Sequence, residues 1–376
     1  MPLGLEPVAP LEVGDERFTP RQALEQVFVE ALSRPPCLLS FSGGRDSSAL
    51  LAVATDVARR HGLTLPIPAT LVFPGSSEAD EDAWQDAVLE HLGLPDRVRI
   101  EIGGSRLDAI GPVAEDVLRR HGLLWPFNTH FHVPIVEQAA GGTVVTGFAG
   151  DELALLSMAA RAERFLARPH RPRVEDLLVL GLALSPRAVR TTVHRRRARG
   201  ELGALPWLTD GGRHLATQAA GRQDGRVPLG WDAKVRKYLW RGRYFRVCVA
   251  SFARIGEDHG VRVVHPFVDP RVLDALARAG GFAGFGDRDD LVGILFGDLL
   301  PEAVVTRPTK AAFTDSLWTD IAIDFARSWS GDGDLPACVD REALHRNWLG
   351  PDRHVMSTLL LQQAWLTSGS RGAAGG

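Results

Sequence analysis

The chain has 376 residues, of which 45% are hydrophobic and 24% are charged, and its formal net charge is −3. This length fits one large domain or two, and the composition excludes a disordered chain and a protein drawn to nucleic acid by its overall charge. Three widely spaced cysteines, Cys37, Cys248 and Cys338, exclude a disulfide framework. Because no apolar run approaches the roughly 18 residues that cross a bilayer, and the first residues do not resemble a signal peptide, we expect a cytoplasmic protein without membrane or nucleic-acid partners.

Strands and helices alternate over the first 150 residues. Helices are expected over 20–32, 47–61, 80–92, 106–121 and 133–140, and strands over 37–41, 67–73, 97–102 and 143–146. Thr19 and Pro20 have the residue types of an N-cap and a first helical position, and Gly62 ends the second helix. This alternation predicts an α/β fold, a parallel twisted sheet with helices on both faces. Ligands of such sheets bind outside the carboxyl ends of the strands, here at the turns after Phe41 and Thr146.

Beyond Leu153 the pattern becomes mostly helical. Helices are expected over 155–168, 174–199, 231–259, 270–279, 288–298, 315–329 and 353–367, and the Gly-rich polar stretch 200–230 is the expected mobile loop. The sequence therefore predicts four parts: a lead-in and helix over 1–35, an α/β core over 36–168, a mainly helical region over 169–367 that completes the active site, and a flexible tail over 368–376.

The turn after the first strand has the composition of an anion-binding loop and reads Ser42-Gly43-Gly44-Arg45-Asp46-Ser47-Ser48. Its glycines let the backbone approach an anion, its hydroxyls add donors, and the following helix directs N-terminal amides to the same point. Asp46 would repel a bare anion, so it implies a divalent cation between carboxylate and phosphate. The spacing is neither Walker A nor the dinucleotide fingerprint. It resembles the SGGxDS signature of the PP-loop ATP pyrophosphatases, which hold the pyrophosphate of ATP and cleave between its α and β phosphates.

A second glycine-containing turn follows the fourth strand and reads Thr146-Gly147-Phe148-Ala149-Gly150-Asp151-Glu152. Taken alone, an Asp-Glu pair in a first helical turn often only compensates the helix dipole. Together with the first turn it favours a functional interpretation, in which Asp46 and Asp151 hold one metal–pyrophosphate unit at adjacent strand ends.

With both turns considered, the chain resembles the synthetase domain of the asparagine synthetase B family, whose relatives include β-lactam synthetases and lasso-peptide cyclases. The second turn is similar to that family's SGEGGDE-type loop. Residues 260–269, GVRVVHPFVD, are similar to its GVExRxPFLD segment, and residues 307–313, RPTKAAF, to its RxxKxxF segment. These matches run in the family's order from about residue 36 to residue 320.

The resemblance implies an AMP- and pyrophosphate-forming amide synthetase (a carbon–nitrogen ligase) with ATP and Mg²⁺ as cofactors. A carboxylate would be adenylated, and an amine would then displace AMP. Lys310, one of only three lysines among 43 basic residues, would stabilise the charge on the phosphates and the later tetrahedral intermediate, with Glu152 as a second catalytic residue. Asp46 and Asp151 would bind the metal ion. The residues expected to bind ATP and pyrophosphate are Ser42, Gly43, Gly44, Asp46, Ser47, Ser48, Thr146, Gly147 and Arg307.

The chain departs from the family at two places. Members that use glutamine carry an N-terminal glutaminase domain with a cysteine after the initiator methionine, whereas here position 2 is proline and only 41 residues precede the first turn. We therefore expect the amine to come from solution, from a separate ammonia source or from the substrate itself. The family also carries Glu or Tyr, which assists proton transfer from the amine, where this chain has Phe148. The candidates to replace it are Glu152, Glu257, His130 and His132.

Several functions stay open at this point. The carboxylate is a small molecule or a peptide, because asparagine-type amidation, lactam closure and peptide macrocyclisation, the last two typical of natural product biosynthesis, share the same ATP chemistry. Another PP-loop reaction, such as tRNA thiolation or nucleotide amination, is a further alternative, of which thiolation is disfavoured because the cysteines are isolated. A non-catalytic or half-reaction ATP-binding protein is favoured only by Phe148. The six arginines between Arg187 and Arg199 are interpreted as a solvated helix face rather than a site for an acidic peptide partner.

Overall fold

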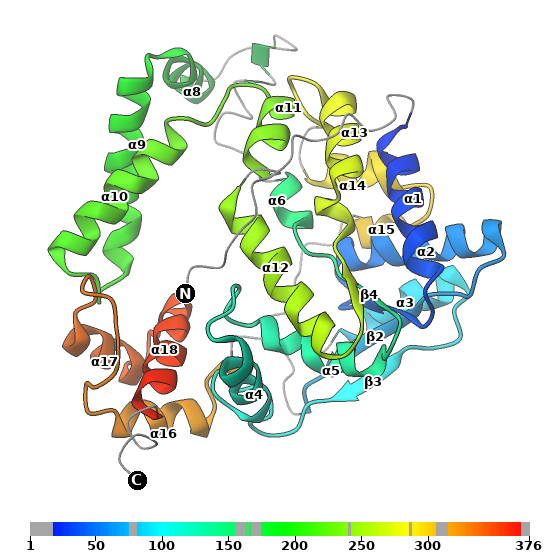
Figure 1. Cartoon of the computed structure of the whole chain (residues 1–376). Coiled ribbons are helices and arrows are strands. Elements are labelled where there is room, and N and C mark those ends of the chain that lie inside the picture. Colours follow the sequence, from blue (N-terminus) through cyan, green and yellow to red (C-terminus); the bar gives the residue numbers. More distant parts are fainter. Residues whose placement is uncertain are drawn as a thin grey trace. The chain divides into compact units, whose positions relative to one another are not determined.

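Two sets of chain segments pack separately in the computed structural model, which describes residues 18–74, 81–154, 163, 165–166, 174–239, 242–285, 288–305 and 315–369. The first set, here the sheet unit, comprises Met1–Ile102, His132–Leu180 and Pro228–Ala312. The second, here the helical unit, comprises Gly103–Phe131, Gly181–Val227 and Phe313–Gly376. Each unit is built from segments far apart in the sequence, as the colours of Figure 1 show. The four-part division of the sequence at residues 35, 168 and 367 stays a prediction.

The sheet unit contains a five-stranded sheet of order β3-β2-β1-β4-β5 in which every pairing is parallel. The strands are β1 (Cys37–Ser40), β2 (Ile67–Val72), β3 (Val98–Glu101), β4 (Thr143–Val145) and β5 (Arg262–Val264). The central strand β1 pairs Leu38 with Ile67 of β2 on one side and with Val144 of β4 on the other. Cys37, Leu38 and Leu39 are almost fully buried, as expected for a strand covered on both faces.

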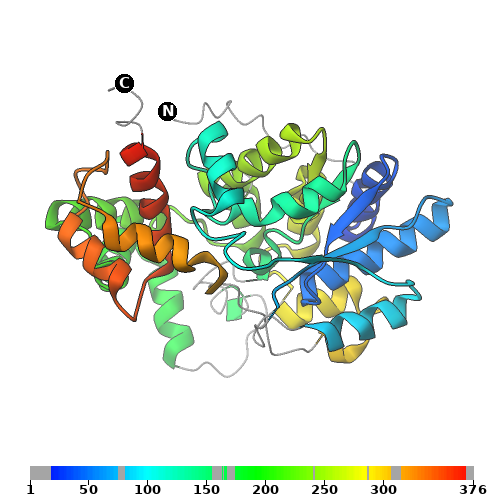
Figure 2. The same ribbon diagram turned by 90° about the horizontal axis from the view of Figure 1, so that it is seen from below.

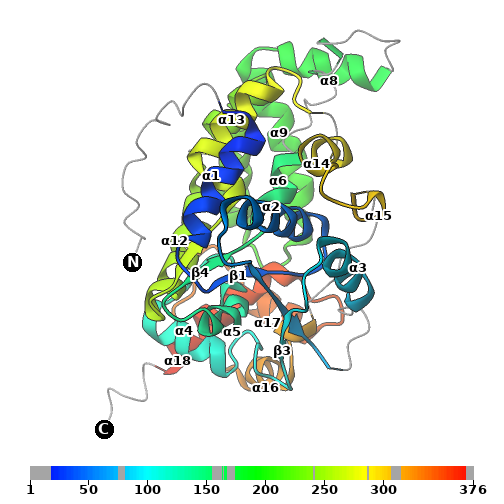
Figure 3. The same cartoon turned by 90° about the vertical axis from the view of Figure 1, so that its right-hand side faces the viewer.

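Helices cover both faces of this sheet, which confirms the predicted α/β fold. In Figures 1 and 3, α1 (Pro20–Leu32) and α2 (Arg45–His61) lie on one face and α5 (Val133–Gln138) lies on the other. Thr19 forms the capping box of α1 with Gln22, and Gly62 ends α2 with a φ of 62°, both as predicted. The other helical elements of the unit are α3 (Asp82–Leu92), α6 (Gly150–Ala154), α11 (Trp231–Lys234), η4 (Val235–Leu239), α12 (Arg243–Asp258), η5 (Pro266–Val268), α13 (Pro270–Gly280), α14 (Arg288–Phe296) and α15 (Glu302–Val305).

The helical unit contains the remaining elements. They are α4 (Pro112–His121), α9 (Arg187–Glu201), η3 (Leu202–Ala204), α10 (Asp210–Asp224), η6 (Asp315–Leu317), α16 (Asp320–Ser328), α17 (Arg341–Leu349), η7 (Val355–Ser357) and α18 (Thr358–Gly369). Figure 2 shows α16, α17 and α18 grouped together in orange and red. Two further elements, η2 (Thr129–His132) and α8 (Val174–Leu184), cross the boundary between the units.

The prediction of a mobile loop over 200–230 is wrong, because α10 occupies about half of this stretch and packs against α9. Gly221 allows this close packing, since a Cβ there would lie 2.2 Å from Cγ of Arg195. A Cβ at Gly225 would likewise lie 2.4 Å from Oγ1 of Thr191. The glycines that suggested a loop are therefore what lets the two helices approach each other.

The predicted start of the helix over 106–121 is also wrong, because α4 begins only at Pro112. The buried carboxylate of Asp108 instead accepts hydrogen bonds from the backbone N–H of Ile110 (3.0 Å) and of Thr319 (2.7 Å). The bond to Ile110 favours a turn before α4, because a side chain that binds a nearby amide competes with helix formation. The bond to Thr319 then fixes this turn against a distant segment.

Other boundaries shift at residues that end or start helices. Ser185 and Pro186 divide the helix expected over 174–199 into α8 and α9, and the one expected over 231–259 is interrupted by the π-helical η4 before Gly242 caps α12. Thr319 caps α16 within 315–329, and a 3-10 turn precedes α18 within 353–367. Neither β5 nor α17 was predicted. The helix expected over 155–168 falls, except for residues 163, 165 and 166, outside the described residues.

Among the helices that the structure describes, none is both long enough and apolar enough to cross a bilayer.

Candidate active site

Both glycine-containing turns belong to the sheet unit and follow neighbouring strands. The first turn joins β1 to α2, and the second joins β4 to α6. Because β1 and β4 are adjacent and parallel, their carboxyl ends open at the same edge of the sheet. The predicted ligands from residues 42–48 and from residues 146–152 therefore emerge at one place.

The backbone of the second turn lies directly against Asp46 of the first. A Cβ added at Gly150 would lie 2.4 Å from Cγ and 2.5 Å from Oδ2 of Asp46. At Gly147 a Cβ would lie 3.5 Å from Cβ of Asp46 and 3.5 Å from the backbone N of Ser47. The absence of a side chain at Gly150 thus leaves the space that the Asp46 carboxylate occupies, one residue away from Asp151.

Hydrogen bonds between its own hydroxyls and backbone close the first turn. Ser47 Oγ donates to the carbonyl oxygen of Gly44 (3.0 Å), lies 3.2 Å from Ser42 Oγ, and accepts from the backbone N–H of Ser42 (3.3 Å). Gly43 has a φ of 76°, and a Cβ there would lie 2.9 Å from Cγ of Gln85 in α3. The sequence of this turn is therefore adapted to a tight backbone path that a side chain at position 43 would disrupt.

The start of α2 is suited to bind an anion. Gly44 is the N-cap residue and places no side-chain hydrogen bond on the first amides of this 17-residue helix. The helix dipole and the N–H groups of a first helical turn favour negative charge at such a terminus. Ser48, by contrast, is fully buried, and its Oγ has no hydrogen-bond partner in the described part of the chain.

The model of the family described as asparagine synthase matches residues 21–367. The chain belongs to the asparagine synthase family. It is therefore an enzyme of an ATP-dependent amidation family, the carbon–nitrogen ligases. A comparison with curated proteins found no match.

The second turn keeps the backbone of a glycine-rich loop at the position where the family's loop has its second glycine. Ala149 stands there and has a φ of 73°. This left-handed conformation costs a side-chain-bearing residue roughly 1–2 kcal/mol. Ala149 thus adopts a conformation that a glycine at this position would adopt without this cost.

Phe148, at the position of the family's Glu or Tyr, lies in an aromatic cluster. Its ring centroid is 6.1 Å from that of Phe245, 5.8 Å from that of Phe252 and 5.5 Å from that of His265. Its side chain is half-buried and packs against the hydrophobic core. These surroundings are those of a packing residue, and no proton acceptor stands at this position.

The candidates to replace the family's Glu or Tyr differ in their surroundings. His130 lies in the helical unit, where Nε2 contacts the carbonyl oxygen of Leu107 (3.1 Å) and burial lowers its pKa to about 4. His132 packs edge-on against Phe252, with ring centroids 4.8 Å apart, and Glu257 is exposed on α12. The ring nitrogen of His130 is thus already engaged by the backbone of Leu107, whereas both turns belong to the sheet unit.

The charge of Glu152 acts on two ionisable groups of α12. The pKa of Tyr244 and the pKa of Cys248 are both raised to about 12, mainly by burial and further by the nearby Glu152 carboxylate. Tyr244 keeps 43% of its surface exposed. The sequence pattern predicts only a packing role for Tyr244, which stands 92 positions after Glu152 and matches no motif.

Lys310 and Lys234, two of the three lysines of this chain, differ in what the structure shows of them. Lys310 and Arg307, the two residues carried over from the family's RxxKxxF segment, lie outside the described residues. Lys234 is fully buried and forms an ion pair with the equally buried Glu163, whose Oε1 also accepts a hydrogen bond from the backbone N–H of Gly230 (2.9 Å). Burial lowers the pKa of Lys234. Its role is therefore to pair a buried carboxylate.

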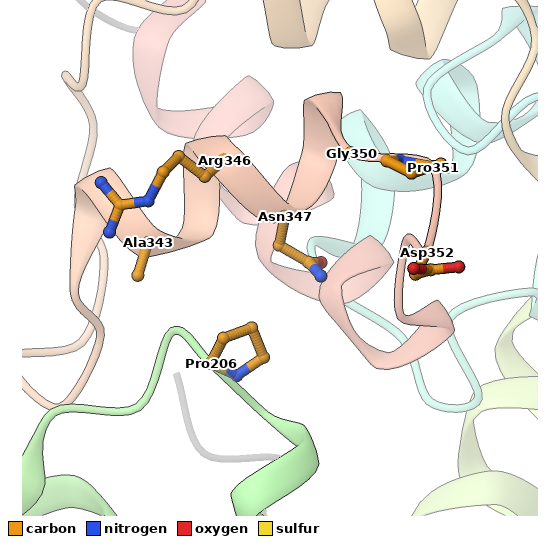
Figure 4. Close-up of a pocket in the computed structure, with 7 residues that line it drawn as sticks. All are labelled: Pro206, Ala343, Arg346, Asn347, Gly350, Pro351 and Asp352. Carbon is orange, nitrogen blue, oxygen red and sulfur yellow. The ribbon is translucent and has the colours of Figure 1, made fainter.

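A separate cavity of about 340 Å³ lies in the helical unit between Pro206 and the end of α17 (Figure 4). Its lining residues are Pro206, Ala343, Arg346, Asn347, Gly350, Pro351 and Asp352. The described residues of the two turns all belong to the sheet unit, so none of them lines this cavity.

Proposed function

We propose that this chain is an ATP-dependent amide synthetase that releases AMP and pyrophosphate. A substrate carboxylate attacks the α-phosphate of ATP, forming an acyl-adenylate and pyrophosphate, and an amine then displaces AMP. The observation that carries the proposal is the contact of Gly150 with the Asp46 carboxylate, which joins the two turns at one sheet edge. The carboxylate donor is a small molecule or a peptide, and the amine comes from the same substrate or from a separate source.

The residues present fit a bound magnesium ion and nucleotide. Carboxylate oxygens are the ligands that Mg²⁺ prefers, and Asp46 and Asp151 supply them from two converging turns. When bound, the ion would offset the negative charge of the phosphates. The first amides of α2 and the glycines and hydroxyls of the first turn would orient the pyrophosphate, since catalysis of this kind depends on positioning and on charge stabilisation.

The test is incubation of the protein with Mg-ATP and panels of carboxylates and amines. We expect carboxylate-dependent exchange of radiolabelled pyrophosphate into ATP, and AMP and amide once the correct amine is added. A chain that binds no nucleotide under these conditions would overturn the proposal.

A second candidate is a half-reaction enzyme that adenylates a carboxylate without forming an amide. The apolar surroundings of Phe148 favour it, because no group at that position takes up the proton of the amine. This alternative would be supported if a carboxylate gives pyrophosphate exchange but no amide forms with any amine tested.

Replacing Lys310 with arginine should lower the rate of pyrophosphate exchange about tenfold. The positive charge is kept, but a planar guanidinium cannot follow charge that moves between phosphate oxygens as a compact ammonium can. Lys237→Arg, at an exposed position of η4, serves as the matched control and should exchange at the unaltered rate. Equal rates for Lys310→Arg and the control would contradict the role assigned to Lys310.

A further inference from the structure

His265 connects the carboxyl end of β5 to the second turn through one hydrogen bond. It follows β5 directly, and only 6% of its surface is exposed. Its Nδ1 lies 2.6 Å from Oγ1 of Thr146, and the same Oγ1 accepts the backbone N–H of Phe148 (3.3 Å). The Thr146 hydroxyl, which stands beside the predicted pyrophosphate site, is therefore held by two neighbours.

The direction of the His265–Thr146 bond follows from the other ring nitrogen. Nε2 of His265 is buried and has no hydrogen-bond partner in the described part of the chain. Buried N–H groups without a partner are rarer than buried acceptors without one, because a lost donor bond is seldom compensated. The ring proton therefore belongs on Nδ1, where it has Thr146 Oγ1 as its acceptor.

The ring also carries a single proton rather than two. Burial, together with the neighbouring His132, lowers the pKa of His265 to about 3. Among the described residues, the rings of Phe148 and Phe252 pack against the imidazole, and both are uncharged. A neutral imidazole with one N–H, donated to Thr146, is the form present at neutral pH.

We propose that His265 is a positioning residue that makes the Thr146 hydroxyl a donor to a phosphate oxygen of the nucleotide. Both lone pairs of Oγ1 are occupied, one by the N–H of His265 and one by the N–H of Phe148, so the hydroxyl proton is left to donate elsewhere. At Gly147, the next residue, an added Cβ would lie 3.5 Å from the backbone N of Ser47, so the turn runs close to the start of α2. An anion bound at that terminus is the acceptor that this hydroxyl would meet, and the inference thus rests on the proposed function.

The first test reads the tautomer of His265 without any nucleotide. In protein labelled with ¹⁵N-histidine, two-bond nitrogen–proton correlations distinguish a protonated Nδ1 from a protonated Nε2, and His265→Asn identifies the signals. We expect the proton on Nδ1. A proton on Nε2 would overturn the inference whether or not the protein exchanges pyrophosphate, which separates this outcome from failure of the proposed function.

The second test measures the KM for Mg-ATP and kcat in pyrophosphate exchange. His265→Leu should raise the KM about tenfold with a smaller effect on kcat, since a lost bond to a charged group changes binding by this order. His265→Asn places an amide N–H where Nδ1–H stands and should restore most of the affinity, whereas His265→Gln, whose amide reaches the Nε2 position, should not. Thr146→Val should resemble His265→Leu, and the double variant should add little to either.

Phe252→Leu is the matched control for packing. It disturbs the same aromatic cluster, with its ring centroid 4.8 Å from that of His265, but leaves the hydrogen bond in place. We expect its KM for Mg-ATP to stay within about twofold of the unaltered protein, in keeping with the loss of packing alone. A KM raised equally by Phe252→Leu and His265→Leu, or no rescue by His265→Asn, would show that His265 only packs and would overturn the inference.

Discussion

Replacing Asp46 with asparagine should slow pyrophosphate formation by about 10²–10³-fold, the range found when one electrostatic contact to a reacting group is removed. Asparagine keeps the shape of the side chain but lacks the charge that binds Mg²⁺. The free energy of unfolding should fall by less than about 1 kcal/mol, the size of the contribution that a carboxylate in the first turn of a helix such as α2 makes. Pyrophosphate release and chemical denaturation of the same preparations give both quantities.

Asp56→Asn provides the control on the same helix. Asp56 pairs with Arg60 at 2.9 Å on the outer surface of α2 and stands far along the helix from the first turn. Its loss should leave the protein folded, since exposed ion pairs contribute little to stability. Because Asp56 is not part of either turn, pyrophosphate release should also stay unchanged. Unchanged turnover in Asp46→Asn would refute the assignment of Asp46 as a metal ligand.

Replacing Gly150 with alanine should remove most of the activity without unfolding the protein. The new methyl group would lie 2.4 Å from Cγ of Asp46, so the carboxylate has to turn away from its position between the two turns. Alanine is also the better helix former at the start of α6, which offsets part of the cost of the contact. We expect pyrophosphate formation to fall by about 10²-fold, as for a misplaced catalytic contact, and the affinity for Mg²⁺ to fall with it.

The double variant Asp46→Asn/Gly150→Ala tests whether the two changes act through one carboxylate. Because both remove the same interaction, the loss in the double variant should be close to that of Asp46→Asn alone. Gly103→Ala is the control for the substitution itself, since a Cβ there meets no atom within 4 Å. Losses that simply multiply in the double variant would mean that Gly150 does not act through Asp46.

The predictions that the structure confirmed depend on residues close together in the sequence. The apolar run at Cys37–Phe41 predicted β1, and the Thr19 cap with Pro20 fixed the start of α1. The wrong predictions have a tertiary cause. The carboxylate of Asp108 holds residues before α4 by binding Thr319, 211 positions away, and the glycines of 200–230 pack α10 onto α9 instead of forming a loop.

The candidate site shows the same division. Motif spacing was enough to propose Asp46, Asp151 and the first-turn serines, and the family model then showed membership over residues 21–367. Their roles as ligands stay predictions. Nothing local pointed to Tyr244 beside Glu152, or to the fit of Gly150 against Asp46, because these partners are separated by about a hundred residues.

The sequence by itself determined that a parallel α/β sheet carries two glycine-rich turns at its carboxyl edge, because hydrophobic periodicity and turn residues act over short distances. Only the tertiary structure decided that β5 pairs with β4, since a three-residue strand has no periodicity to detect. That pairing brings His265 to Thr146 across 119 positions of the chain, and the direction of their hydrogen bond depends on the burial of Nε2. Burial is a property of packed neighbours, which no stretch of sequence contains alone.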